Sequence, residues 1–130
     1  MNVKGFNHIT LNISDLERSL EFYQRVLRMS LVHKGRKDAY LEWGEAWICL
    51  LEKKNFSSVD TQSFGVNHFA FSIAKEDFFE AVHQLENHDV TIVRGPIKRG
   101  KGWTINFLDP DGIEMELHTS NLQERMTVWE

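Results

Sequence analysis

The chain has 130 residues, which is the length of one typical domain and excludes a multidomain enzyme. Hydrophobic residues make up 42% and charged residues 26%, a balance typical of a folded globular protein rather than a disordered one. The formal net charge of −4 argues against general nucleic-acid binding, which needs clustered positive charge.

The single cysteine, Cys49, means that no intrachain disulfide can form, and this suits a reducing compartment. The N-terminal sequence lacks the apolar core of a signal peptide, and no apolar run approaches the ~20 residues of a membrane helix. We therefore expect a single cytoplasmic domain with no membrane or nucleic-acid partner.

One sequence pattern occurs twice, 60 residues apart. Residues 5–13 read GFNHITLNI and residues 65–73 read GVNHFAFSI, so the glycine, the asparagine, the histidine and the last isoleucine coincide. Each copy is followed by a helix-like segment and then by short strand-like segments, which indicates a duplication. We predict an α+β fold of two paired βαβββ modules that form a cupped mixed sheet. The modules cover about 4–52 and 64–119, and 120–130 is a C-terminal tail.

The first module is predicted to begin with a strand, because apolar and polar residues alternate in NHITLNI. Ser14 and Glu17 then match a capping box, in which the hydroxyl caps a helical amide and the glutamate reaches back. The helix that follows has apolar residues at spacings of three and four, namely Leu16, Leu20, Tyr23 and Leu27. Strands are expected near 31–33, 38–42 and 46–51, and 52–63 is expected to be a polar linker between the modules.

The second module repeats this order. We predict a strand at 67–73 and a helix whose core face consists of Phe78, Val82 and Leu85. A strand at 90–93 precedes a loop at 95–102 that is rich in glycine and basic residues. The remaining elements are expected to be a strand, a DPDG turn, a strand and a short helix, at 104–108, 109–112, 113–118 and 122–129.

His8 and His68 occupy the same position in the two copies, on the polar face of each first strand. Imidazole is the commonest protein ligand for a transition metal, so the pair is a candidate metal site if both rings reach one cavity. The alternative is a pair of packing histidines that the duplication carried along. A third ligand could come from one face of the last strand, where parity does not choose among Glu114, Glu116 and His118.

Two basic clusters could neutralise a small anionic ligand beside such a cavity, or could be solvated loop charge. They consist of Lys34, Arg36 and Lys37 at one turn, and of Arg94, Lys98, Arg99 and Lys101 around the glycine-bearing loop. Tyr40 and Trp47 lie on the middle strands, where they either line the cavity or belong to the core. Cys49 is expected to be a core thiol rather than a nucleophile.

Three features of the chain point to one superfamily: the paired NH-x-x-x-x-[IV] strands, the first helix DLERSLEFYQRVL, and the ending FLDPDG-x-x-x-E-x-H. With them the chain resembles the vicinal oxygen chelate (glyoxalase/bleomycin resistance/dioxygenase) superfamily, and within it most resembles the fosfomycin-resistance enzymes. The segments NHITL, GRKDAYLEWGEAWICLLE, NHFAFSI, FLDPDGIEMELHT and NLQERM follow in that family's order. The likeness covers nearly all of 1–130, which would then be a single vicinal oxygen chelate domain.

The resemblance implies a metal-dependent transferase or epoxide hydrolase that opens the epoxide of fosfomycin with glutathione, another thiol or water, and so gives antibiotic resistance. It also implies a homodimer whose sites are built from both subunits. A divalent metal, usually Mn²⁺ but with Fe²⁺, Ni²⁺ or Zn²⁺ as possible substitutes, would be held by His8, His68 and Glu116. Thr10 and Tyr40 match family positions next to the reacting groups. Thr10 points to the glutathione-using or epoxide-hydrolysing branches, because the bacillithiol-using branch usually has cysteine there.

Trp47 and Arg125 fall on positions that line the family's site. With Lys98 and Arg99 of the basic cluster, and Asn106, they make up the residues expected to bind the small anionic substrate. The chain departs from the family at Asn106, where a tyrosine is usual. It departs again in the preceding loop, PIKRGKGW, which lacks the acidic and serine residues of the glutathione branch. Both departures concern the place where the substrate phosphonate would bind.

Two other functions are compatible with these residues. One is another metal-dependent enzyme of the superfamily, such as a glyoxalase-type lyase or isomerase or a dioxygenase; the other is a non-catalytic small-molecule binder. Glyoxalase I would need a second glutamate ligand from the last strand of the first module, which reads AWICLL with Glu52 at its end. Retention of both histidines and the carboxylate disfavours a binder without metal.

Overall fold

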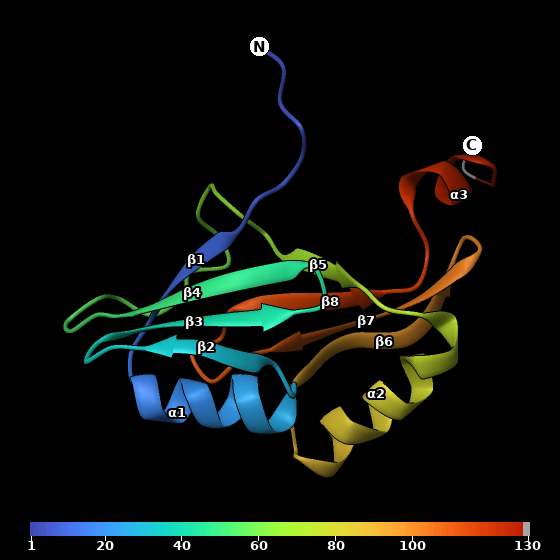
Figure 1. Ribbon diagram of the computed structural model, residues 1–130. Coiled ribbons are helices and arrows are strands. Elements are labelled where there is room, and N and C mark those ends of the chain that lie inside the picture. Colours follow the sequence, from blue (N-terminus) through green and yellow to red (C-terminus); the bar gives the residue numbers. More distant parts are fainter. Residues whose placement is uncertain (129–130) are drawn as a thin grey trace. The chain divides into compact units, whose positions relative to one another are not determined.

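The computed structural model describes residues 1–128 (Figure 1), and the chain divides into two compact units, 1–57 and a second from residue 58 onward. Each unit contains one four-stranded mixed sheet, and the element order βαβββ occurs in each. The predicted α+β fold with two βαβββ modules is therefore confirmed. None of the helices between residues 1 and 128 is long and apolar enough to cross a membrane.

The first unit is a sheet with one helix packed on one face. Its elements are β1 (Ile9–Ile13), α1 (Leu16–Leu20), its π-helical continuation η1 (Glu21–Val26), β2 (Ser30–Lys34), β3 (Asp38–Trp43) and β4 (Ala46–Glu52). The strand order is β1-β4-β3-β2, with β1 parallel to β4 and the other pairs antiparallel. The helix contacts β4 and is drawn below the strands of this unit in Figure 1. The buried strand residues that share one face of the sheet are Leu11, Ile13, Ala39, Leu41, Ile48 and Leu50. Because side chains alternate along a strand, the polar side chains of the same strands lie on the opposite face.

The first helix begins one residue later than the sequence pattern indicated. Asp15 is the N-cap, and its carboxylate accepts a hydrogen bond from the backbone N–H of Arg18 at 2.9 Å. The Ser14 hydroxyl instead accepts a hydrogen bond from the Arg18 guanidinium at 2.7 Å, and Glu17 pairs with Lys34. The predicted capping box is therefore wrong, because an adjacent aspartate serves as a cap at least as well as serine. The predicted core face of this helix is confirmed by the burial of Leu16, Leu20, Tyr23 and Leu27.

The second unit repeats the plan with a longer helix. Its elements are β5 (Phe69–Ser72), α2 (Lys75–Asn87), β6 (Ile92–Arg99), β7 (Gly102–Leu108), β8 (Glu114–His118) and α3 (Leu122–Met126). The strand order is β5-β8-β7-β6, with β5 parallel to β8. Helix α2 packs on β7 through the predicted residues Phe78, Val82 and Leu85. Of the predicted C-terminal helix, α3 ends at Met126, and Trp129 lies outside the described residues.

The basic segment that was expected to be a loop is part of strand β6, which corrects the sequence-based prediction. Strand β6 pairs with β7 through two register shifts, the second between Arg94 and Ile97. Gly95 lies at this irregularity with φ of +95°, and a Cβ atom there would approach the carbonyl oxygen of Thr104 to 2.6 Å. A glycine and a bulge interrupt the alternation that normally identifies a strand. The result is that Arg94 lies opposite Asn106.

The DPDG turn determines how β8 meets β7. The Asp109 carboxylate accepts hydrogen bonds from the backbone N–H groups of Asp111 and Ile113 at 2.9 and 2.8 Å. These bonds close the turn directly before β8 begins. The resulting register places Asn106 opposite Glu116.

Candidate functional site

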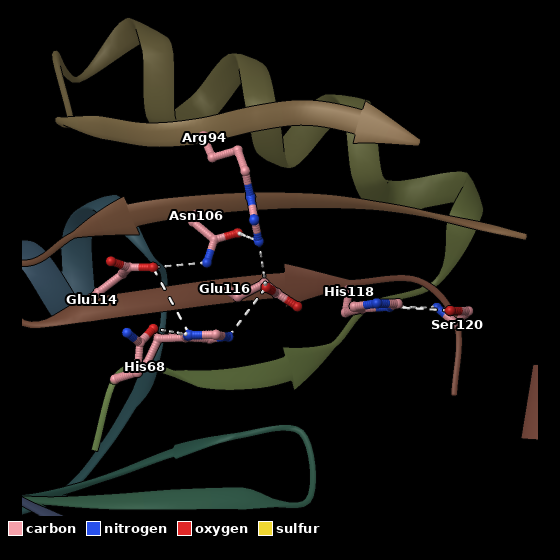
Figure 2. Close-up of polar contacts among 8 residues, drawn as sticks. His68, Arg94, Asn106, Glu114, Glu116, His118 and Ser120 are labelled. Atoms are coloured by element: carbon pink, nitrogen blue, oxygen red, sulfur yellow. Dashed lines mark hydrogen bonds and ion pairs between the residues drawn. The ribbon is translucent and has the colours of Figure 1, made fainter. Parts of the chain in front are cut away.

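Polar side chains cluster on one face of the second sheet (Figure 2). They come from all four strands or the residues next to them, and they are His68, Arg94, Asn106, Glu114 and Glu116. On β8 they alternate with Met115 and Leu117, which are buried. The period of two along β8 thus directs the carboxylates away from the apolar core.

His68 and Glu116 are close enough to share one ion. The distance from His68 Nε2 to Glu116 Oε1 is 3.4 Å, and Glu116 is only 7% exposed. Two ligand atoms bound to one ion at about 2.1 Å each lie about 3 to 3.5 Å apart. An imidazole nitrogen and a carboxylate oxygen also form a donor pair that suits a divalent transition metal. These two residues therefore fit a metal ion.

The buried side-chain amide of Asn106 binds Glu114 and not Glu116, so the two carboxylates have different partners. Asn106, which is 1% exposed, donates a hydrogen bond from Nδ2 to Glu114 Oε2 at 2.9 Å. Its Oδ1 accepts a hydrogen bond from Arg94 Nη2 at 3.4 Å, and the same Nη2 atom lies 3.8 Å from Glu116 Oε1. Glu114 is thus engaged by Asn106, and its Oε2 lies 4.0 Å from Nδ1 of His68, on the opposite side of the ring from Glu116.

His118, the third candidate on β8, is engaged elsewhere. Its Nδ1 accepts a hydrogen bond from the backbone N–H of Ser120 at 3.0 Å and lies 3.2 Å from the Ser120 hydroxyl. Parity along the strand left Glu114, Glu116 and His118 equivalent as ligands. The contacts favour Glu116, since it is the one that faces Nε2 of His68.

The first unit carries several of the expected site residues on the sheet face opposite the helix. The His8 ring stacks on Trp47 with centroids 4.1 Å apart and planes inclined by 21°. Tyr40 meets Trp47 edge to face at 5.8 Å. Thr10 on β1 and Tyr40 on β3 are both paired with Cys49 on the central strand β4. His8, Thr10, Tyr40 and Trp47 therefore share one face.

Cys49 is on this same face but buried. Burial raises the pKa of its thiol, the charge of Asp38 raises it further, and a hydrogen bond with Thr10 works in the opposite direction. The net effect leaves the thiol less ionised than an exposed cysteine, which disfavours nucleophilic chemistry. The expectation of a buried, unreactive thiol agrees with these observations.

Glu52, at the end of β4, stabilises the start of α1. Its Oε2 accepts a hydrogen bond from the backbone N–H of Leu16 at 2.8 Å, and Oε1 lies within 3.5 Å of Lys37 Nζ and 3.4 Å of Lys54 Nζ. The Leu16 hydrogen bond is the main cause that lowers the pKa of this carboxyl group. A glutamate engaged in this way is poorly suited to be the additional ligand of a glyoxalase I site.

Three of the cations expected at the site are not part of the cluster in Figure 2. Lys98 is exposed, Arg99 is half-buried on β6, and Arg125 is half-buried on α3. Arg94 takes their place beside Asn106 and Glu116. Arg94 belongs to the basic cluster of the sequence, but only the strand register identifies it as a residue of this site.

Asn7 and Asn67 are two further residues beside the histidines that were not predicted from the sequence. Each contacts the histidine that follows it in the chain, with Oδ1 2.6 Å from His8 Nδ1 and 2.7 Å from His68 Nδ1. The signal for them was the asparagine that coincides in the two repeats. Among residues 1–128, no group of three or more histidine, cysteine, aspartate or glutamate side chains could hold one ion.

The fold and these side chains define a known class. A model of the Glyoxalase/Bleomycin resistance protein/Dioxygenase superfamily matches residues 5–117, and the chain belongs to this superfamily. It is 40% identical over 129 residues to the metallothiol transferase FosB of Staphylococcus epidermidis (strain ATCC 12228), covering 97% of this chain and 89% of that protein. It is 36% identical over 124 residues to the glutathione transferase FosA of Serratia marcescens, covering 95% of this chain and 86% of that protein.

Solved structures give the same result. The fosfomycin resistance protein FosX of Listeria monocytogenes, solved with Mn(II) and a sulfate ion, matches with a TM-score of 0.80 and 28% identity. The match covers 99% of this chain and 100% of that chain. The resemblance found in the sequence, to this superfamily and to fosfomycin-resistance proteins, is thereby confirmed.

Proposed function

We propose that this chain is a metal-dependent enzyme that opens the epoxide ring of fosfomycin with a thiol or water and so confers resistance to it. The observation that carries the proposal is the approach of His68 Nε2 to Glu116 Oε1 at 3.4 Å. It occurs in a chain with 36–40% identity to thiol transferases of the FosA and FosB types.

In this proposal His8, His68 and Glu116 hold one divalent ion. Mn²⁺ is the first choice because the FosX of Listeria monocytogenes was solved with it, and the same donors would also accept Fe²⁺, Ni²⁺ or Zn²⁺. When bound, the ion would supply Lewis-acid stabilisation of the negative charge that develops on the epoxide oxygen. Because His8 belongs to the other unit, we propose that a homodimer builds each site from both of its subunits.

Arg94 is proposed to bind the phosphonate. Its guanidinium is half-exposed, lies beside Glu116 and is oriented by the carbonyl oxygen of the Asn106 side chain. A guanidinium binds phosphonate oxygens through charge-assisted hydrogen bonds, which are stronger than neutral ones. Lys98, Arg99 and Arg125 would add positive charge around this anion.

Thr10, Tyr40 and Trp47 are proposed to act on the other side of the substrate. The Trp47 and Tyr40 rings, which meet edge to face, would form an apolar surface against which the carbon skeleton of the substrate packs. The hydroxyl groups of Thr10 and Tyr40 would orient the nucleophile by hydrogen bonding. The relatives include both metallothiol and glutathione transferases, so identity alone does not choose the nucleophile. Thr10 favours glutathione or water as the nucleophile, and we propose that the reaction takes place in the cytoplasm.

Phosphorus NMR tests this function directly. Fosfomycin is incubated with the protein and Mn²⁺, with and without glutathione, and with His68→Ala as the control. We expect a new phosphonate signal that requires Mn²⁺ and is lost in the variant. A product that needs glutathione would identify a transferase, and a diol formed without it would identify a hydrolase. Absence of conversion under both conditions would refute the proposed function.

A further inference from the structure

We propose that Asn7 and Asn67 are positioning residues that fix the tautomer of His8 and His68. Each asparagine would keep the ring hydrogen on Nδ1, so that each ring presents an unprotonated Nε2 to a metal. This inference rests on the proposed metal site. Its structural basis, however, lies within each unit separately, in contacts between neighbouring residues.

The same contact occurs in both units. Asn7 Oδ1 lies 2.6 Å from His8 Nδ1, and Asn67 Oδ1 lies 2.7 Å from His68 Nδ1. An amide oxygen only accepts hydrogen bonds, so the imidazole nitrogen that faces it must be the donor. The residues around the two Asn-His pairs differ, since Phe6 corresponds to Val66 in the repeat. The contact is thus reproduced in different surroundings.

Oxygen acceptors lie on both sides of the His68 ring, and the Asn67 oxygen is the nearest of them. On the Nδ1 side lie two acceptors, the oxygen of Asn67 and, at 4.0 Å, the carboxylate of Glu114. The Nε2 atom faces Glu116 Oε1 at 3.4 Å. Of these acceptors only the Asn67 oxygen, at 2.7 Å, is at the usual distance of an N–H···O hydrogen bond, so we place the hydrogen on Nδ1, and the lone pair of Nε2 then faces the proposed co-ligand.

The His8 ring is held in a second way. It stacks on Trp47 at 4.1 Å, which restricts the ring plane, while Asn7 determines which nitrogen carries the hydrogen. A metal ligand whose plane and tautomer are both fixed loses less conformational freedom on binding. Outer partners of ligating histidines typically contribute a factor of about 10 to 100 in metal affinity.

His118 provides an internal control, because its contacts require the opposite tautomer. Its Nδ1 accepts a hydrogen bond from the backbone N–H of Ser120 at 3.0 Å. A backbone N–H only donates, so the hydrogen of this ring must be on Nε2. His118 is therefore expected to show the opposite tautomer to His8 and His68 in the same protein.

The first test is nitrogen NMR of metal-free protein with labelled histidine, at about pH 8.5, where imidazoles are neutral. The signals are assigned by single replacement of each histidine. We expect Nδ1–H rings at His8 and His68 and an Nε2–H ring at His118. Nε2–H rings at His8 and His68 would overturn the inference.

The second test is the affinity for Mn²⁺, which is measured from the electron paramagnetic resonance signal of the free ion. Asn7→Ala and Asn67→Ala should each weaken binding about 10- to 100-fold. Asn7→Asp and Asn67→Asp keep an acceptor oxygen and should restore the affinity of the unaltered protein. Asn87→Ala, at the exposed end of α2, is the matched control and should change nothing.

The outcomes separate this inference from the proposed function. Alanine variants that bind Mn²⁺ as tightly as the unaltered protein, or aspartate variants no better than alanine, would overturn the inference alone. If the unaltered protein bound no Mn²⁺, the proposed function would fail, and the tautomers measured in metal-free protein would still decide the role of the asparagines. Circular dichroism of each variant verifies that a lost affinity is not lost folding.

Discussion

His68 and Glu116 face each other, with Nε2 3.4 Å from Oε1, while the other nitrogen of the same ring is turned toward Asn67 and Glu114. The ring thus divides the two carboxylates of β8 between its two sides. Glu116 is the proposed co-ligand of His68, and Glu114 accepts a hydrogen bond from the buried amide of Asn106.

This division predicts unequal effects of two matching substitutions. Glu116→Gln should weaken Mn²⁺ binding by more than the 10- to 100-fold that is typical of residues outside the ligand set. Glu114→Gln keeps a hydrogen-bond acceptor for Asn106 and should weaken it about 10-fold or less. Titration of the free ion in both variants measures the difference. Equal losses, or a larger loss in Glu114→Gln, would contradict the assignment of Glu116 as ligand.

Arg94 should act on the substrate rather than on the metal. We expect Arg94→Ala to lower kcat/KM for fosfomycin about 10- to 100-fold, because a hydrogen bond to a charged group contributes about 1.5 to 3 kcal/mol. The change should fall mainly on KM. Lys98→Ala, which removes an exposed cation on the same strand, is the control and should have a smaller effect. Steady-state kinetics at saturating Mn²⁺ would contradict the role of Arg94 if Lys98→Ala were the more damaging change.

The register that brings Arg94 to this place was not predictable from the sequence pattern. Alternation identified β1, and helical spacing identified the core faces of α1 and α2, because these elements each bury one regular face. Strand β6 has no such regular face, since the shift at Gly95 changes which side chains point to the site. A run of glycine and basic residues then has the composition of a loop.

The candidate site was predictable to the extent that it repeats. The duplicated Asn-His pair identified His8 and His68, and the DPDG turn placed a carboxylate four residues beyond Gly112. Side-chain hydrogen bonds between neighbouring residues leave no trace in hydrophobic periodicity, so the function of Asn7 and Asn67 was not visible. Strand parity did not choose between Glu114 and Glu116; the resemblance chose Glu116, and its contact with His68 supports that choice.

Asn106 should contribute to stability through its two partners. Asn106→Leu has a similar volume but leaves the Glu114 carboxylate and the Arg94 guanidinium without this amide, in a position that is 1% exposed. Loss of a buried partner costs about 1 to 3 kcal/mol, more where the group left is charged. Urea unfolding should show a decrease of at least that size, whereas Asn87→Leu on the exposed end of α2 should be close to neutral. An unchanged midpoint for Asn106→Leu would argue that water replaces the amide.

Glu52 should make the stability of the protein depend on acid pH. Its pKa is lowered in the folded protein, first by the Leu16 hydrogen bond and also by Lys54 and Lys37. A carboxyl group with a lowered pKa stabilises the fold above its ordinary pKa, and this contribution disappears as the pH falls through the lower, folded-state value. Glu52→Gln should therefore lower Tm at pH 7, and the difference from the unaltered protein should vanish at strongly acid pH.

Thermal unfolding followed at a series of pH values measures this effect. Glu80→Gln is the control, because Glu80 is exposed on α2 and should leave Tm unchanged throughout. A Tm difference for Glu52→Gln that persisted, or grew, in acid would show that the glutamate stabilises α1 by packing and not by its charge.

Cys49 should be slow to react with thiol reagents although it shares a sheet face with Thr10 and Tyr40. Burial, followed by the charge of Asp38, raises the pKa of the thiol, so less of the reactive thiolate is present at a given pH. With Ellman's reagent at pH 8, the folded protein should react more slowly than the same protein in urea. As the pH is raised, the reaction rate of Cys49 in the folded protein should begin to increase at a higher pH than in the urea-unfolded protein. Thr10→Val removes the hydrogen bond that opposes this shift and should slow the reaction further.

Cys49→Ala should keep the Mn²⁺-dependent conversion of fosfomycin, and loss of this conversion would mean that the thiol takes part in the reaction.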